Sequence, residues 1–202
     1  MSQRILLSDD EVVAAAVRLG KDWKASLPTI SVEDPADLIR AAARGHRSLY
    51  LRGLLTGPDN SELVPEVSAL LGPAAGAVPQ HLGYAADSAN PHVVAGMRFA
   101  IFDSARHNNK ILIVTLPNGI NEVSEVQLGA ARDFVEAFAA APLQAGAEGK
   151  AVVLIAPDGK DSAGFGVVTA KGTTSGAGEL PLLDLESGLP TRGVPATLVP
   201  SA

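Results

Sequence analysis

The histidines are the residues of this chain that could most readily do chemistry, and three of the four lie near one another in the sequence. His81, His92 and His107 share a stretch with Asp87 and Asp103. Two imidazoles and a carboxylate form a ligand set that zinc or non-haem iron accepts. The histidines are 11 and 15 residues apart, which matches no helical pair of ligands. We therefore interpret them as loop histidines and expect no metal site.

A serine hydrolase is the second chemistry that these residue types allow. Ser88, His92 and Asp103 supply a nucleophile, a base and an orienting acid. The nucleophile of an α/β-hydrolase sits in a Gly-x-Ser-x-Gly turn, and the sequence contains no such motif. We therefore assign no catalytic residue.

The glycines near the C-terminal end form the third candidate, a phosphate-binding loop. Gly164 and Gly166 are followed by Gly176 and Gly178. A dinucleotide fingerprint places its glycines between a strand and a helix, but no helical pattern follows Gly178. We interpret these residues as glycines that permit turns, and we expect no cofactor.

Paired carboxylates suggest general acid–base chemistry at the N-terminal end. Asp9, Asp10 and Glu11 follow Ser8, which is a favourable helix N-cap. Acidic side chains in a first helical turn are stabilised by the helix dipole. Their position therefore accounts for these acids without a catalytic role.

The composition is that of a folded protein and limits its partners. The chain has 202 residues, 47% of them hydrophobic and 19% charged, with a formal net charge of −6. The absence of cysteine excludes disulfides, thiolate metal sites and cysteine nucleophiles. Because no block of Lys and Arg interrupts the acidic chain, we expect no nucleic-acid partner. With neither a signal-peptide pattern nor an apolar run of about 18 residues, we expect a cytoplasmic protein without membrane contact.

Helical patterns come first in the chain and strand patterns later. Helices are expected over residues 8–20, from either Ser31 or Asp34 to Gly45, and over residues 61–71. A long loop is expected over residues 72–91. Strands are expected over residues 94–102, 110–116 and 120–123, with a tight turn at residues 117–119. A helix with Phe134 and Phe138 on one face follows. Residues 151–156 and 165–170 predict a hairpin, and residues 171–178 predict a loop.

This order of elements predicts an α+β fold. It has a helical N-terminal third, an antiparallel β-sheet with one packed helix, a C-terminal β-hairpin and an irregular tail. We expect one α+β domain over residues 1–178, with a helical subregion over residues 1–72. The irregular tail is expected over residues 179–202.

The same order also resembles a known family. Residues 38–40 begin a helix that leads into the phrase Arg52-Gly53-Leu54-Leu55. A Leu-rich helix, two strands over residues 97–102 and 111–116, and the Phe134/Phe138 helix follow. Over residues 35–141 this is similar to one half of the EspG-type chaperones of actinobacterial type VII secretion. The resemblance implies a cytosolic chaperone that binds a helical secretion substrate and has no catalytic site.

We hypothesise that the protein binds other proteins, without catalysis, through its sheet and the loops around it. Edge strands and loops on a rigid scaffold commonly carry such recognition. The expected partner-binding residues are Leu82, Arg98, Arg106, His107 and Lys110. The sequence leaves a homo-oligomer open. The alternative is a small enzyme or ligand-binding domain whose pocket lies near residues 81–107.

Overall fold

The computed structural model describes residues 4–25, 27–31, 34–144, 146–158 and 162–179. The chain order of its elements begins with β1 (Arg4–Ser8), α1 (Asp9–Arg18), α2 (Pro35–Leu51), β2 (Leu55–Thr56), η1 (Pro58–Asn60), β3 (Glu62–Leu63) and α3 (Pro65–Leu71). It continues with β4 (His81–Asp87), β5 (Asn90–Asp103), β6 (Asn109–Thr115), β7 (Ile120–Gln127), α4 (Leu128–Ala140), η2 (Ala141–Leu143), β8 (Lys150–Asp158), β9 (Ser162–Thr169) and β10 (Gly172–Glu179). The predicted α+β fold, with its helical N-terminal part and large antiparallel sheet, is confirmed.

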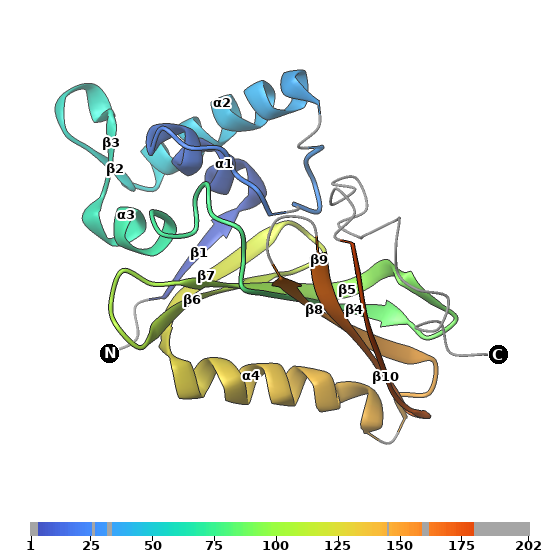
Figure 1. Ribbon diagram of the computed structural model, residues 1–202. Coiled ribbons are helices and arrows are strands. Elements are labelled where there is room, and N and C mark those ends of the chain that lie inside the picture. Colours follow the sequence, from blue (N-terminus) through green and yellow to red (C-terminus); the bar gives the residue numbers. More distant parts are fainter. Residues whose placement is uncertain (1–3, 26, 32–33, 145, 159–161, 180–202) are drawn as a thin grey trace.

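Eight strands form one antiparallel sheet in the order β1-β7-β6-β5-β4-β8-β9-β10 (Figure 1). Strands β4 to β7 pair as successive neighbours, and β8 to β10 extend the sheet beyond β4. The N-terminal β1 joins the opposite edge, where it pairs with β7. The predicted turn between β6 and β7 is present, and Gly119 adopts the positive φ of 76° that this turn requires.

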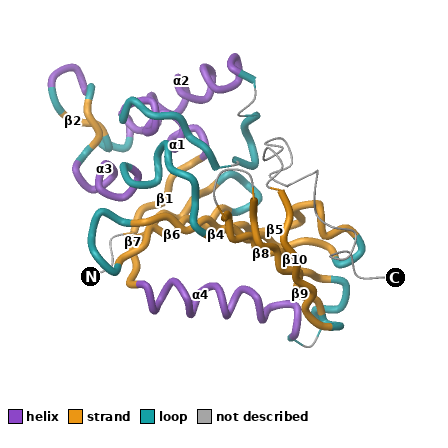
Figure 2. The backbone as a smooth tube through the Cα atoms, viewed as in Figure 1, coloured by secondary structure: helices purple, strands orange, loops and turns teal. Residues whose placement is uncertain are grey.

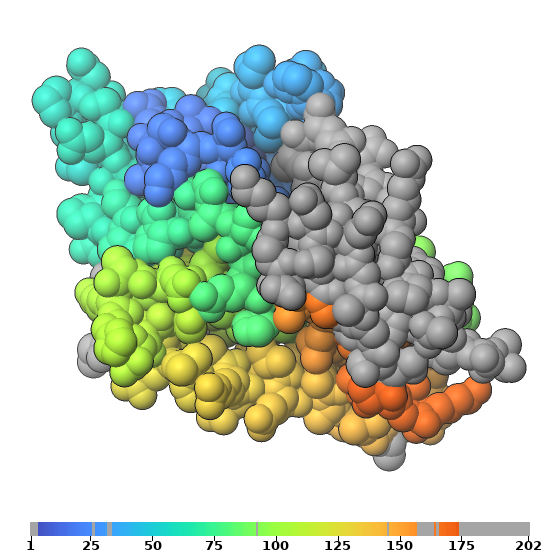
Figure 3. Space-filling view, in the orientation of Figure 1, coloured from blue at the N-terminus to red at the C-terminus, as the bar shows by residue number. Residues whose placement is uncertain are grey.

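Helices cover both faces of this sheet. Figure 2 shows α1, α2 and α3 on one side of the strands and α4 on the other, and Figure 3 shows these two layers on opposite sides of the molecule. Successive residues of a strand face opposite sides. Ala100 and Phe102 of β5 therefore pack under the N-terminal helices, whereas Phe99 and Ile101 pack against α4. The core is thus divided between the two faces of the sheet.

The predicted cap of α1 is confirmed. The Ser8 hydroxyl accepts a hydrogen bond from the Glu11 amide, and the Glu11 carboxylate accepts one from the Ser8 amide. This reciprocal pair is a capping box. Glu11 also accepts hydrogen bonds from Ser48 at 2.7 Å and from Arg52 at 2.6 Å, both on or next to α2. Glu11 therefore joins α1 to α2.

Asp9 joins the helical layer to the sheet. Its buried carboxylate accepts hydrogen bonds from the Thr29 amide and hydroxyl and, at 2.7 Å, from the Asn121 side chain of β7. The Thr115 hydroxyl of β6 donates to Asn121 in turn. A buried carboxylate is tolerated only when it is hydrogen-bonded in this way. The acids at the start of α1 thus have a structural role, as expected.

The prediction that the second helix ends at Gly45 is wrong, because α2 continues to Leu51. Gly45 lies where α2 crosses α1. A Cβ atom at this position would lie 1.9 Å from the backbone oxygen of Asp10. The glycine therefore permits close approach of the two helices and does not end one of them.

Two further predictions are corrected by strand pairing. Residues 72–91 are not one loop, because they contain β4, which pairs with both β5 and β8. Residues 172–178 of the predicted loop belong to β10, which pairs with β9. Residues 4–8, for which no element was expected, form β1. The third helix is shorter than expected and begins at Pro65. The predicted irregular tail lies, from residue 180 onward, outside the described residues.

Candidate functional site

A groove runs along one side of α4, between this helix and the sheet. Two adjoining hollows of about 320 and 330 Å³ form it, and both are lined by His81 and Val135. The α4 groove, as this feature is called below, is lined by Gln80, His81, Leu82, Phe99, Ile101, Lys110, Leu128, Ala131, Arg132, Val135, Glu136, Leu154, Ile155, Ala156, Gly164 and Gly166. Most of this lining is apolar, and it opens to solvent.

Strand register places the floor of the groove in one row. Ile101 of β5 pairs with His81 of β4, and Ala156 of β8 pairs with Gly164 of β9. The β4–β8 ladder brings Ala156 beside His81. These four residues therefore face α4 from four adjacent strands, over a width of about 14 Å.

The glycines in and near this floor fall into two groups. At Gly83 a Cβ atom would lie 2.3 Å from the ring of Phe99, so packing within the chain requires glycine there. Among the described residues, a Cβ at Gly166 would meet nothing within 4 Å, and a Cβ at Gly164 would meet only the Ala156 oxygen at 3.9 Å. Neither Gly164 nor Gly166 has a positive φ. Their interpretation as turn glycines is therefore wrong, since both lie inside β9 and nothing in the described chain requires them to be glycine.

A polar cluster closes one end of the groove. Lys110 Nζ donates hydrogen bonds to Gln80 Oε1 and Asp103 Oδ1, both at 2.7 Å. The Gln80 amide donates to the other oxygen of Asp103. Burial lowers the pKa of His81, and the charge of Lys110 lowers it further. The lowered pKa favours the neutral imidazole, which can donate or accept a hydrogen bond in the groove.

The opposite face of the sheet holds a small cavity of about 40 Å³ next to Trp23. The Trp23 cavity is lined by Trp23, Ala25, Leu27, Pro79, Leu82, Gly83, Tyr84, Val94, Arg98, Phe99, Ala100, Ile113, Thr115, Asn121 and Ile155. Within the described residues, the buried indole nitrogen of Trp23 has no hydrogen-bond partner. Burial lowers the pKa of Arg98, and the charge of Asp9 opposes that shift. The cavity has room for a few water molecules or a small polar group.

The structure does not bring the five predicted partner-binding residues onto one surface. Leu82 lines both the α4 groove and the Trp23 cavity. Arg98 lines the cavity under the N-terminal helices, whereas Lys110 lines the groove on the opposite face. Arg106 and His107 lie in the turn between β5 and β6. The α4 groove therefore contains Leu82 and Lys110 of this set.

Ion pairs already neutralise two of the predicted basic residues. Arg106 pairs with Glu125 at 2.7 Å, and Lys110 pairs with Asp103. The hydrogen bond from Ser104 is the main cause of a lowered pKa of Glu125, and Arg106 adds to it. Neither cation therefore offers an uncompensated charge to a partner.

Strand β5 separates the residues considered for catalysis and for metal binding. Ser88 lies in the turn before β5, His92 near the start of β5 and Asp103 at its end, so about 35 Å of extended chain separates His92 from Asp103. His81, opposite Ile101, lies near the Asp103 end. Among the described residues, no group of three His, Asp or Glu side chains is placed to hold a metal ion.

Sequence reasoning identified His81, Leu82 and Lys110 but missed Val135, Gly164 and Gly166 as parts of one site. An isolated glycine inside a strand pattern is the signal that could have pointed to the last two. In the described part of the chain, no helix is both long and apolar enough to cross a membrane. The chain matches no protein-family model and no curated protein.

Proposed function

We propose that this protein is a non-enzymatic protein-binding module whose α4 groove receives a helical segment of a partner. It acts as a cytosolic chaperone or adaptor for a helical secretion substrate, as the resemblance to the EspG-type chaperones implies. The support comes from the shape and lining of the groove.

The observation that supports this proposal is a pair of glycines, Gly164 and Gly166 of β9, which lie on the floor of the groove and are not covered by the described chain. A glycine in a strand weakens the sheet, and it commonly marks a place where a ligand or another backbone approaches closely. Gly83 has an explanation within the chain, because the ring of Phe99 occupies the space of its missing side chain. Gly164 and Gly166 face the open groove instead. A partner that packs closely against β9 explains why these two positions are glycine.

A helix fits the space beside α4. α4 itself contacts β6, β7 and β8, and the groove extends past α4 onto β9. Two helices packed side by side lie 8–10 Å apart, so a second helix beside α4 would lie over β8 and β9. Its apolar stripe would bury Val135, Leu154 and Ile101, which line the groove.

The five predicted residues have unequal roles in this proposal. Leu82 and Lys110 contact the partner in the groove, and Arg106 and His107 lie at its margin in the β5–β6 turn. Because ion pairs neutralise Arg106 and Lys110, we expect these rim charges to change association rate and salt dependence only modestly. Arg98 lies on the other face and acts on the groove only through the strand it belongs to.

A small enzyme or ligand-binding domain is the second candidate, and His81 favours it. A neutral imidazole beside a lysine, at the centre of a groove of this size, is a suitable group for proton transfer or ligand recognition. The two candidates place different occupants in the same groove.

Affinity purification from the native cell, with mass spectrometry, tests the proposal when the groove is blocked in a matched variant. Gly166→Phe places a ring in the groove, where a Cβ atom meets no atom of the described residues within 4 Å. Ala137→Phe places the same ring on the exposed outer side of α4. We expect wild type and Ala137→Phe to capture the same partner and Gly166→Phe to lose it.

Two results would count against the proposal. Capture of the same partner by Gly166→Phe would show that the groove is not the binding surface. A purified protein that captures no partner but turns over a small molecule, with loss of turnover in His81→Ala, would establish the second candidate instead.

A further inference from the structure

The outer side of α2 carries an apolar stripe that the described chain leaves uncovered. α2 packs on α1 through Ala41, Gly45 and Leu49, and Figure 1 shows it as the outermost helix of its layer. On the other side, Ile39 is 71% exposed and Tyr50 is 53% exposed. A 17-residue helix held along one side thus presents large apolar groups to solvent along the other.

The spacing of this stripe is that of a helix–helix seam. The outer stripe of α2 consists of Ala36, Ile39, Ala43 and Tyr50, which are all exposed. Ala36, Ala43 and Tyr50 are seven residues apart, and Ile39 lies three residues after Ala36. Apolar residues at these intervals form the a and d positions of a coiled coil. The stripe is about 21 Å long, and its two alanines allow a second helix to approach closely.

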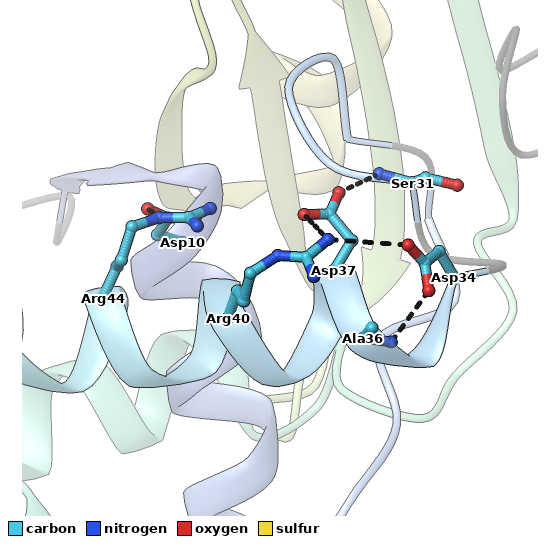
Figure 4. A network of polar contacts seen from close by, with 7 residues as sticks. All are labelled: Asp10, Ser31, Asp34, Ala36, Asp37, Arg40 and Arg44. Carbon is cyan, nitrogen blue, oxygen red and sulfur yellow. Dashed lines mark hydrogen bonds and ion pairs between the residues drawn. The ribbon is translucent and has the colours of Figure 1, made fainter.

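Three arginines border the stripe on one side. Figure 4 shows Arg40 directed toward Asp34 and Asp37, and Arg44 beside Asp10. The basic heads lie further out than two of these acids: the Arg40 side chain is 58% exposed against 24% for Asp37, and Arg44 is 52% exposed against 26% for Asp10.

Arg47 continues the border toward the C-terminal end of α2. It is exposed and has no ion pair among the described residues. Because Asp10, Asp34 and Asp37 compensate Arg40 and Arg44, Arg47 carries the uncompensated positive charge of this flank among the described residues.

We propose that the outer stripe of α2 binds an amphipathic helix of another protein, whose apolar seam is bordered by glutamate or aspartate. The apolar seam supplies the contact area, and the unpaired charge of Arg47 favours an acidic flank. This surface lies on the opposite side of the sheet from the α4 groove, so the inference goes beyond the proposed function and does not depend on it.

The same arginines argue against a second copy of this chain as the occupant. In an antiparallel pair of helices, equivalent flanks face each other. Arg40 and Arg47 of one copy would then face the same arginines of the other. In a parallel pair, the arginines would face the flank of Ala42 and Leu49, which is turned toward α1.

A designed peptide tests this surface. The probe is a fluorescein-labelled peptide of three heptads with Leu at a and d and Glu at e and g, because its acidic flanks oppose self-association. The control peptide carries Lys in place of every Glu. We expect fluorescence anisotropy to show binding of the Glu peptide to wild type and no binding of the Lys peptide.

Protein variants locate the binding. Ile39→Asp should weaken binding of the Glu peptide at least tenfold, and its exposed position leaves folding intact. Arg47→Glu should weaken it about tenfold and should allow the Lys peptide to bind. Val93→Asp, at an exposed apolar residue of β5, and Gly166→Phe in the α4 groove should leave the affinity unchanged.

Three outcomes overturn the inference. The first is no binding of the Glu peptide to wild type, and the second is equal binding to wild type and Ile39→Asp. The third is a dimer in sedimentation that Ile39→Asp converts to monomer, which would make a second copy the occupant.

Discussion

Glycine has opposite meanings at the α1–α2 crossing and on the floor of the α4 groove. At Gly45 a side chain would collide with the backbone of Asp10 at 1.9 Å, whereas at Gly166 it would meet nothing within 4 Å. The first glycine exists because the chain packs closely on itself. The second leaves a space that the described chain does not fill. A missing side chain thus marks a closed contact in one place and, in another, a space open to the partner that we propose.

The largest effect is expected from Gly45→Val. The new side chain forces α1 and α2 apart, and we expect a loss of about 4 kcal/mol or more in the free energy of unfolding. Ala43→Val, on the exposed side of the same helix, should cost only about 0.5 kcal/mol, the difference in helix propensity. Urea unfolding followed by circular dichroism measures both. Equal stabilities of the two variants would disprove the close approach at Gly45.

Phe138→Ala tests the packing of α4 on the sheet. Phe138 is buried and meets the ring of Phe99 edge to face at a centroid distance of 5.0 Å. Truncation of a buried phenylalanine costs about 3–5 kcal/mol, so the melting temperature should fall by many degrees. Leu143→Ala, at an exposed residue just after α4, serves as the control. A Phe138→Ala protein that melts with the wild type would show that α4 does not form one wall of the groove.

Ser104→Ala tests the anchoring of the β5–β6 turn at the groove margin. The Ser104 hydroxyl holds the pKa of Glu125 below its ordinary value of 4.5. A lowered carboxyl pKa adds stability above the unfolded pKa, and this stability is lost as the pH falls through the folded pKa. We expect a loss of about 1 kcal/mol at pH 7, shrinking as the pH falls below 4.5. Unfolding at several pH values measures it, and a difference that stays constant with pH would contradict this account.

The smallest effect is expected from Gly166→Ala, which tests whether this glycine is required by packing within the chain. The added methyl group enters open space without a positive φ, so stability should stay within about 0.5 kcal/mol of wild type or rise slightly. Gly83→Ala, in β4 beside the groove, should cost about 1–3 kcal/mol because the ring of Phe99 must move. Thermal unfolding compares the two. A large loss at Gly166 would mean that the groove is closed by the chain itself.

Local signals in the sequence predicted much of the fold. The cap at Ser8, the turn at Gly119 and the helix of Phe134 and Phe138 each depend on a few neighbouring residues, and all three are present. The prediction that a helix ends at Gly45 was wrong because its local pattern is that of a helix end, whereas its role depends on Asp10 in another helix. Propensity alone also missed β1, β4 and β10, since pairing with distant strands forms them.

The candidate site was less predictable because strand register decides it. Alternation along β5 and β6 turns Arg98 and Lys110 to opposite faces, and no short pattern reveals which face each helix covers. Gly164 becomes part of a groove only when Ala156 pairs with it and α4 crosses the neighbouring strands. The residue types were visible in the sequence, but their arrangement came from contacts between distant segments.

The pairing of β1 with β7 has a consequence for the order of folding. The hydrogen bond between Asp9 and Asn121 joins residues 112 positions apart, and β1 has the similarly distant β7 as its strand partner. During synthesis, the N-terminal helices therefore leave the ribosome well before their sheet exists. Contacts of such high sequence separation slow folding and expose apolar surface in the meantime. The N-terminal layer is made first in time but docks among the last, so its mutations should mainly accelerate unfolding and leave the folding rate little changed.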